Sequence, residues 1–218
     1  MQKVWITFVA IFLGASSVAA QVPVERLPQG SGLAGWAVEA IPVPEMQGRL
    51  ERQRSQTSVA VYAGQTGIAR KSVEPGFFAS AQFDAFGGDR QKLVYNGRAF
   101  LRVQAAQQYV LVATPVASSR HRQEGCELII NVGGKPVVGG TFRPLPSRLT
   151  TVRVGRATGP ELLSGNVNLQ PGFYPIEFIV GCLRSFEPIP LEIQFQVREE
   201  RDAAPRNFAA GELFHVQR

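Results

Sequence analysis

The chain of 218 residues has little of the chemistry on which enzymes and metal sites depend, since it holds two histidines and two cysteines. His121 lies between two arginines, His215 lies three residues before the C-terminus, and neither belongs to a cluster with zinc-ligand spacing. A nucleophile elbow of the type Gly-x-Ser-x-Gly is absent. The sequence therefore predicts no catalytic residue, no metal site and no cofactor.

Long runs of like charge are also absent, although the chain carries a net charge of +6. Its arginines are scattered singly, which argues against a nucleic-acid surface. A basic protein of this kind can still bind an acidic polysaccharide or an acidic protein partner. Beyond the N-terminus, no apolar segment reaches the roughly 20 residues that a membrane-spanning helix needs.

The N-terminus has the pattern of an export signal. Lys3 supplies a basic end, Val4 to Leu13 is a nearly unbroken apolar run, and the small residues Val18, Ala19 and Ala20 suit signal peptidase. We therefore expect residues 1–20 to be a signal peptide that is cleaved after Ala20. The mature protein would then be periplasmic, extracellular or attached to the cell surface.

Export changes the interpretation of the two cysteines, because disulfides persist in oxidising compartments. Cys126 begins one strand-like run and Cys182 follows another. We expect the two sulfurs to form a disulfide that joins strands distant in sequence and helps to hold two face-to-face sheets together.

Short strand-like runs separated by glycine and proline fill residues 59–198, and no segment of ten or more residues there has helical periodicity. Asn96-Gly97 is a strong two-residue hairpin signal between two of these runs. This pattern favours an all-β antiparallel sandwich or barrel. The expected strands are 58–63, 77–86, 92–95, 98–103, 108–114, 127–132, 135–138, 148–154, 166–169, 173–180 and 191–197.

The two flanks of this domain have a different composition. Residues 21–58 are rich in proline, glycine and glutamine and predict an irregular arm that holds one strand over residues 33–43. Trp36 in that strand is either a plug for the core or an anchor for a partner, and we prefer the plug. Residues 199–218 form a short charged tail in which Phe208, Leu213 and Phe214 are the residues able to dock it.

Five segments together resemble the PA14 domain: Lys92–Gly97, Phe100–Val103, Gln108–Val112, Cys126–Val138 and Asn168–Phe178. The resemblance spans roughly residues 77–197 and implies a β-sandwich. Sugar-binding members of that family hold calcium with an adjacent pair of aspartates. The matching loop here has Ser118 and Ser119, so the resemblance implies the sandwich without that calcium site.

Another carboxylate pair, Asp84 and Asp89, flanks the turn at Gly87-Gly88 and could reach a calcium ion or a sugar hydroxyl. Aspartates in such positions more often cap the turn itself. We therefore interpret both residues as turn residues.

The first functional hypothesis is a non-enzymatic interaction module of the cell envelope that binds an envelope protein or an anionic polysaccharide. It would use the basic loop Arg120, His121 and Arg122 together with the N-terminal arm, and deleting residues 21–56 would leave a folded domain that no longer joins its partner. The alternative is a carbohydrate-binding or adhesin-like domain. Its candidate binding residues are Tyr95, Asn96, Arg98 and Tyr174.

Overall fold

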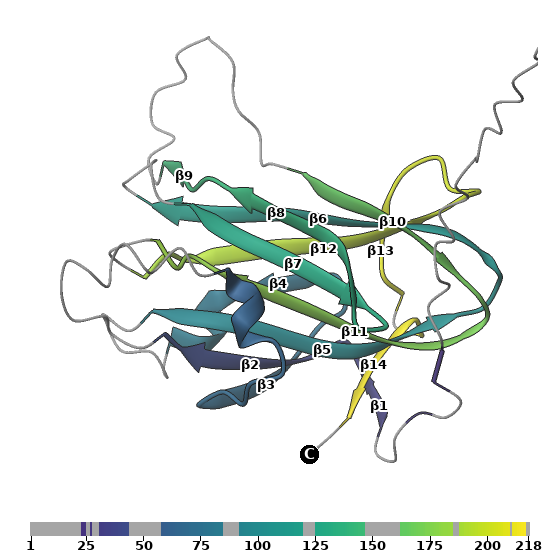
Figure 1. Cartoon of the computed structure of the whole chain (residues 1–218), viewed down its shortest axis with the longest axis horizontal. Helices are drawn as coiled ribbons and strands as arrows, with labels where there is room; N and C mark the ends of the chain where they lie inside the picture. The colour runs from purple at the N-terminus through teal and green to yellow at the C-terminus, as the bar shows by residue number, and fades with distance from the viewer. Residues whose placement is uncertain are drawn as a thin grey trace, which may run out of the picture.

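A computed structural model describes residues 23–24, 27, 31–43, 58–84, 92–119, 125–146, 162–184, 188–209 and 211–216. Two antiparallel sheets lie face to face in these residues (Figure 1). The predicted all-β antiparallel sandwich is confirmed. In the described part of the chain no helix is long and apolar enough to cross a membrane.

The larger sheet, which we name sheet A, has two long strands at its centre, β5 (Leu93–Val103) and β11 (Gly172–Gly181). Its main strand order is β1 (Ser31–Ala34), β14 (Leu213–Val216), β5, β11, β7 (Cys126–Val132) and β8 (Lys135–Phe142), with β2 (Trp36–Pro42) paired to β5 and β3 (Ala69–Val73) paired to β2.

Sheet B packs on one face of sheet A. Its main strand order is β10 (Leu163–Leu169), β6 (Gln107–Ser119), β12 (Leu191–Glu199) and β13 (Arg206–Asn207), with β4 (Phe77–Ala79) paired to β12 and β9 (Leu145–Pro146) parallel to β6. Two short 3-10 turns, η1 (Val59–Tyr62) and η2 (Ser80–Phe83), complete the described elements.

The core lies between the sheets and is rich in aromatic side chains. Alternate residues of β12 are buried, as the period-two pattern of its sequence predicts. Phe195 from this strand packs against Phe178 of β11, with ring centroids 4.7 Å apart. Trp36 lies 5.0 Å from the Phe178 ring and 5.2 Å from the Phe195 ring. Aromatic contacts of this kind join both sheets to the N-terminal strand.

Parts of both predicted flanks belong to the sandwich. The strand expected over residues 33–43 is present as β1 and β2, interrupted at Gly35, and β2 pairs with the central strand β5. In the tail, Phe208 and Leu213 are buried, and β14 pairs with β5. The sheets therefore extend beyond the predicted boundaries of 59–198. We now expect deletion of residues 21–56, which removes β1 and β2, to unfold the domain.

The hairpin expected at Asn96-Gly97 is wrong, because β5 continues through both residues. Gly97 pairs with Phe178 on one side and with Val38 on the other. A Cβ atom at Gly97 would lie 2.0 Å from the Phe178 ring, so glycine here makes room for an aromatic ring. The same dipeptide that favours a turn thus satisfies a packing requirement inside a strand.

Other local expectations also differ from the structure. The run 58–63 forms η1 instead of a strand, and the run 77–86 forms only the short β4 before η2 begins. The strand expected over 108–114 extends to Ser119, and the one expected over 135–138 extends to Phe142. The expected strand 148–154 lies outside the described residues.

The predicted disulfide between Cys126 and Cys182 is present. Because Glu127 pairs with Gly181, the two cysteines face each other across the β7–β11 ladder, with Cα atoms 4.0 Å apart. The bond therefore joins neighbouring strands of sheet A, and the expectation that it holds the two sheets together is wrong. Core packing holds the sheets face to face.

Candidate functional site

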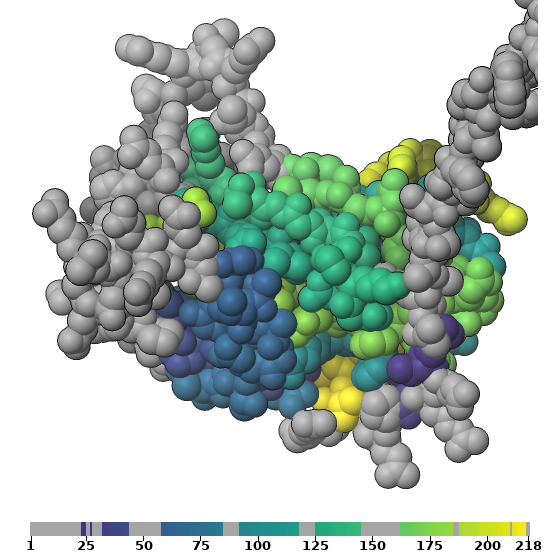
Figure 2. All heavy atoms as spheres, in the orientation of Figure 1, coloured from purple at the N-terminus to yellow at the C-terminus, as the bar shows by residue number. Residues whose placement is uncertain are grey.

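The outer face of sheet A, turned away from sheet B, is partly covered by residues 58–68, which we call the flap. In Figure 1 its blue η1 turn lies in front of the strands. Val59 and Tyr62 are buried against a small apolar cluster that includes Val94 and Ile179. Figure 2 shows blue residues of the 58–84 region packed on this face, with green and teal strands uncovered beside them. The flap thus occupies only part of the face.

Three glutamates on the outer face accept hydrogen bonds from backbone N–H groups of the flap. The carboxylate of Glu127 accepts from Val59 N at 2.8 Å, and that of Glu39 accepts from Gly67 N at 3.0 Å. Glu177 accepts a longer bond of 3.4 Å from Gly64 N. These flap N–H groups have no hydrogen-bond partner within a helix or sheet, so the carboxylates pair them. This arrangement holds the flap against the strands along its length.

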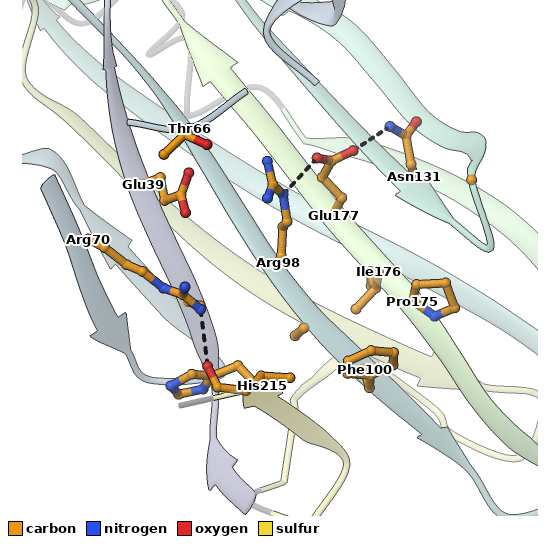
Figure 3. A pocket seen from close by; sticks show the side chains of 14 residues that line it. Glu39, Thr66, Arg70, Arg98, Phe100, Asn131, Pro175, Ile176, Glu177 and His215 are labelled. Atoms are coloured by element: carbon orange, nitrogen blue, oxygen red, sulfur yellow. Dashed lines mark hydrogen bonds and ion pairs between the residues drawn. The ribbon is translucent and has the colours of Figure 1, made fainter. Parts of the chain in front are cut away.

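A groove with a volume of about 770 Å³ opens beside the flap, and we call it the outer-face groove. Figure 3 shows a polar row across it, formed by Arg98, Glu177 and Asn131 from β5, β11 and β7. The Glu177 carboxylate accepts from Arg98 Nε at 3.4 Å and from Asn131 Nδ2 at 3.3 Å. Arg98 Nη2 also donates to the flap carbonyl of Gln65 at 3.0 Å. Hydrogen bonds therefore join the three side chains of the row, and the flap holds its Arg98 end.

The rest of the groove combines apolar and basic groups. Phe100 and Pro175 lie next to each other on paired strands and add apolar surface beside the polar row. At the edge of the sheet, the exposed Arg70 donates from Nη2 to the carbonyl of Val216 at 3.0 Å. This mixture of hydrogen-bonding side chains and apolar patches suits a small polar ligand with some C–H surface.

The groove carries balanced charge, because Arg98 and Glu177 form an ion pair and Arg70 and Glu39 have opposite signs. No group of three or more histidine, cysteine, aspartate or glutamate side chains within the described ranges is placed to hold a metal ion. The planar side chains of Arg98, Glu177 and Asn131 can donate and accept hydrogen bonds.

His215 lies at the same edge and is 3 % exposed. Its Nε2 shares a hydrogen bond of 2.8 Å with Ser72 Oγ, while the buried Nδ1 has no hydrogen-bond partner among the described residues. Burial, assisted by the positive charge of Arg70, lowers the pKa of His215, although nearby backbone carbonyls of Gly35 and Leu33 oppose the shift. The folded protein therefore favours the neutral form of this ring.

This lowered pKa predicts a loss of stability in acid. As pH falls below about 6.5, the unfolded chain binds a proton at its histidine while the folded chain resists it, so the unfolded state is favoured. We expect the free energy of unfolding, measured with urea, to fall between pH 7.5 and pH 5.5. His215→Gln should weaken this dependence because it removes the titrating group. An equally steep pH dependence in H215Q would contradict the attribution of the acid-induced loss of stability to His215.

The structure brings one of the eight sequence-derived ligand-binding candidates, Arg98, into the groove. Trp36 and Tyr174 are 0 % exposed, and the Tyr174 hydroxyl donates to the carbonyl of Gln170 at 3.0 Å. Tyr95 is buried against Phe78, and burial raises its pKa to about 12. These three side chains belong to the core.

The remaining candidates fall into two groups. Asn96 is 1 % exposed and donates from Nδ2 to the flap carbonyl of Tyr62 at 3.3 Å, so the flap covers it. Arg120, His121 and Arg122, the proposed basic loop, lie outside the described residues. Asp89 also lies outside them, while Asp84 is the C-cap residue of η2.

Sequence reasoning missed most of the groove. Glu177, Asn131 and Glu39 lie on strands whose alternate residues face the core, which places these polar residues on the opposite face. That alternation is a usable signal, but it does not say which strands are neighbours. The contribution of Thr66 depends on the path of the flap, which has no comparable signal.

Known proteins resemble this chain in their structure. No protein-family model and no curated protein matches the sequence. A PA14 sugar-binding domain from an RTX adhesin matches the structure with a TM-score of 0.50 at 10 % identity, over 84 % of this chain and 99 % of that one. The PA14 domain of the MpAFP antifreeze protein gives 0.51 at 11 % identity, over 88 % of this chain and 96 % of that one.

This chain has a PA14-like fold. The resemblance seen in its sequence segments is thereby confirmed at the level of architecture. Because the identities are so low, the match concerns the arrangement of the strands and says nothing about ligands. The outer-face groove has to be interpreted from its own residues.

Proposed function

We propose that the protein is an exported, non-catalytic domain that binds carbohydrate in the outer-face groove. The observation that carries this proposal is the fixed polar row of Arg98, Glu177 and Asn131 beside the apolar surface of Phe100 and Pro175. A sugar ring offers hydroxyls to the planar polar groups and a C–H face to the apolar ones. The sugar-binding PA14 domain of the adhesin supplies a precedent for this ligand class on the same architecture.

The pre-formed geometry supports binding without large rearrangement. Arg98 is held by Glu177 and by the flap, so little side-chain entropy remains to be lost when a hydroxyl is bound. Burial of a drug-sized or disaccharide-sized ligand is possible in a groove of about 770 Å³. We therefore expect recognition of one or two sugar units at a time.

The test is a glycan array followed by calorimetry on the best ligand. We expect Arg98→Ala to weaken binding by about 10- to 100-fold, because it removes a charged hydrogen-bond donor. Asn131→Ala, which leaves the flap contacts intact, should weaken binding by a smaller factor. Calcium should not be required.

Arg102→Ala is the matched control, because Arg102 lies four residues along the same strand, is exposed, and does not line the groove. Its affinity should equal that of the unmodified protein. Equal affinities for R98A and R102A, or an array without any glycan bound, would overturn the proposal.

Export is supported by the N-terminal sequence and by the disulfide, which is typical of oxidising compartments. The mature protein would begin at Gln21. Mass spectrometry of the protein recovered from its own cells tests this, and an intact N-terminal segment would contradict it.

A further inference from the structure

A second pocket, which we call the cystine-end pocket, lies where the disulfide joins β7 to the end of β11. It has a volume of about 310 Å³ and includes Arg143, Arg184, Thr141, Glu127 and Ser58 in its lining. None of these residues lines the outer-face groove. The flap connects the two sites, because Ser58 at its start lines this pocket and Thr66 near its end lines the groove.

The strand ladder and the disulfide together position the two arginines. Phe142 pairs with Cys126, so Arg143 leaves β8 one residue beyond that pair. Cys126 is bonded to Cys182, and Arg184 follows two residues later. The backbones that carry both guanidinium groups are therefore tied to the same residue of β7 from opposite sides. Their spacing is set by hydrogen bonds on one side and by a covalent bond on the other.

Both arginines are exposed, and among the residues that the structure describes neither has an ion-pair or hydrogen-bond partner. Arg206 shows the contrast, because its guanidinium bonds Glu199 and Glu212 at 2.7 Å each and locks the tail in place. Arg206 thus has two carboxylate partners, whereas no described carboxylate pairs with Arg143 or Arg184.

One carboxylate does line the pocket, but its oxygens are engaged by the flap. Glu127 Oε1 accepts from Ser58 Oγ at 2.7 Å, and Oε2 accepts from Val59 N at 2.8 Å. Among the lining residues that the structure describes, two arginines and one glutamate give an excess of one positive charge. The hydroxyl of Thr141 adds a neutral donor.

We propose that the cystine-end pocket binds an oxyanion, either a carboxylate or a sulfate ester, carried by an acidic polysaccharide. Guanidinium groups present paired N–H donors whose spacing matches the oxygens of such anions, and two arginines line this pocket. The volume accommodates a single charged sugar unit. The proposal of an anion site is argued from the residues that line this pocket. The choice of a polysaccharide as the carrier of the anion rests on the proposed function.

Calorimetry with the full mature chain tests the proposal, using oligogalacturonate as the carboxylate probe, dextran sulfate oligosaccharide as the sulfate probe and neutral dextran oligosaccharide as the blank. We expect at least one acidic probe to bind. The double variant R143A/R184A should weaken that binding by at least about 10-fold, since it removes the charged donors. The two acidic probes identify which oxyanion is preferred.

The control is R198A/R201A, which removes the same charge from exposed residues outside the pocket. It should retain affinity within about two-fold at 150 mM salt, where distant charges are screened. An equal loss in both double variants, no binding of either acidic probe, or preference for anionic phospholipid vesicles over both would overturn the proposal. Failure of the proposed carbohydrate site can be told apart from failure of the oxyanion site. If the two sites are independent, N131A should leave the effect of R143A/R184A on binding of the acidic probes unchanged.

Discussion

Replacing Trp36 by alanine should lower the free energy of unfolding by about 3–5 kcal/mol, which is the typical cost of removing a large buried aromatic side chain. Trp36 is 0 % exposed and contacts Phe178 of sheet A and Phe195 of sheet B. Its Nε1 also donates to the carbonyl of Pro75 at 2.9 Å, so the truncation leaves a cavity and an unpaired acceptor.

Urea unfolding followed by far-UV circular dichroism measures this effect. Trp36→Phe, which keeps a ring in the core but loses the Nε1 donor, should cost clearly less than the alanine variant. Ile68→Ala is the control, because this side chain is 53 % exposed and its removal should change stability by no more than about 0.5 kcal/mol. A W36A variant as stable as I68A would show that β2 is not part of the core.

The same residue shows what the sequence could establish about the fold. An isolated tryptophan with alternating neighbours predicted one strand and a plug for the core within the N-terminal arm, and the structure contains that strand and buries Trp36. Composition alone did not show that this strand pairs with β5 in the middle of the chain. Such long-range pairing depends on which surfaces fit together, and local propensity carries little information about it.

Gly97 shows the opposite case. The dipeptide Asn96-Gly97 carries a strong local signal for a turn, yet the ring of Phe178 requires a residue without a side chain at that point of the sheet. Tertiary packing therefore overrode the local preference. The same difficulty affected the site: Arg98 was among the candidates, but Glu177 and Asn131 lie on neighbouring strands whose pairing with β5 and with each other the sequence did not reveal.

Removing the disulfide should have the other large effect on stability. The bond closes a loop with a sequence separation of 56 residues, and the chain-entropy model assigns such a loop about 4 kcal/mol. We expect the double variant C126A/C182A to lose about this amount in urea unfolding. The native sheet should still form, because β7 and β11 remain paired over six residue positions beside the missing bond.

Reductant separates the effect of the bond from the effect of the substitutions. Adding dithiothreitol should lower the stability of the unmodified protein toward that of C126A/C182A and leave the variant unchanged. The variant should also bind the acidic probes more weakly, since the bond fixes the backbone near Arg184 relative to Arg143. If the variant lies within about 1 kcal/mol of the unmodified protein, then the β7–β11 ladder alone restrains this loop, and the covalent bond adds little beyond what hydrogen bonds and packing already supply.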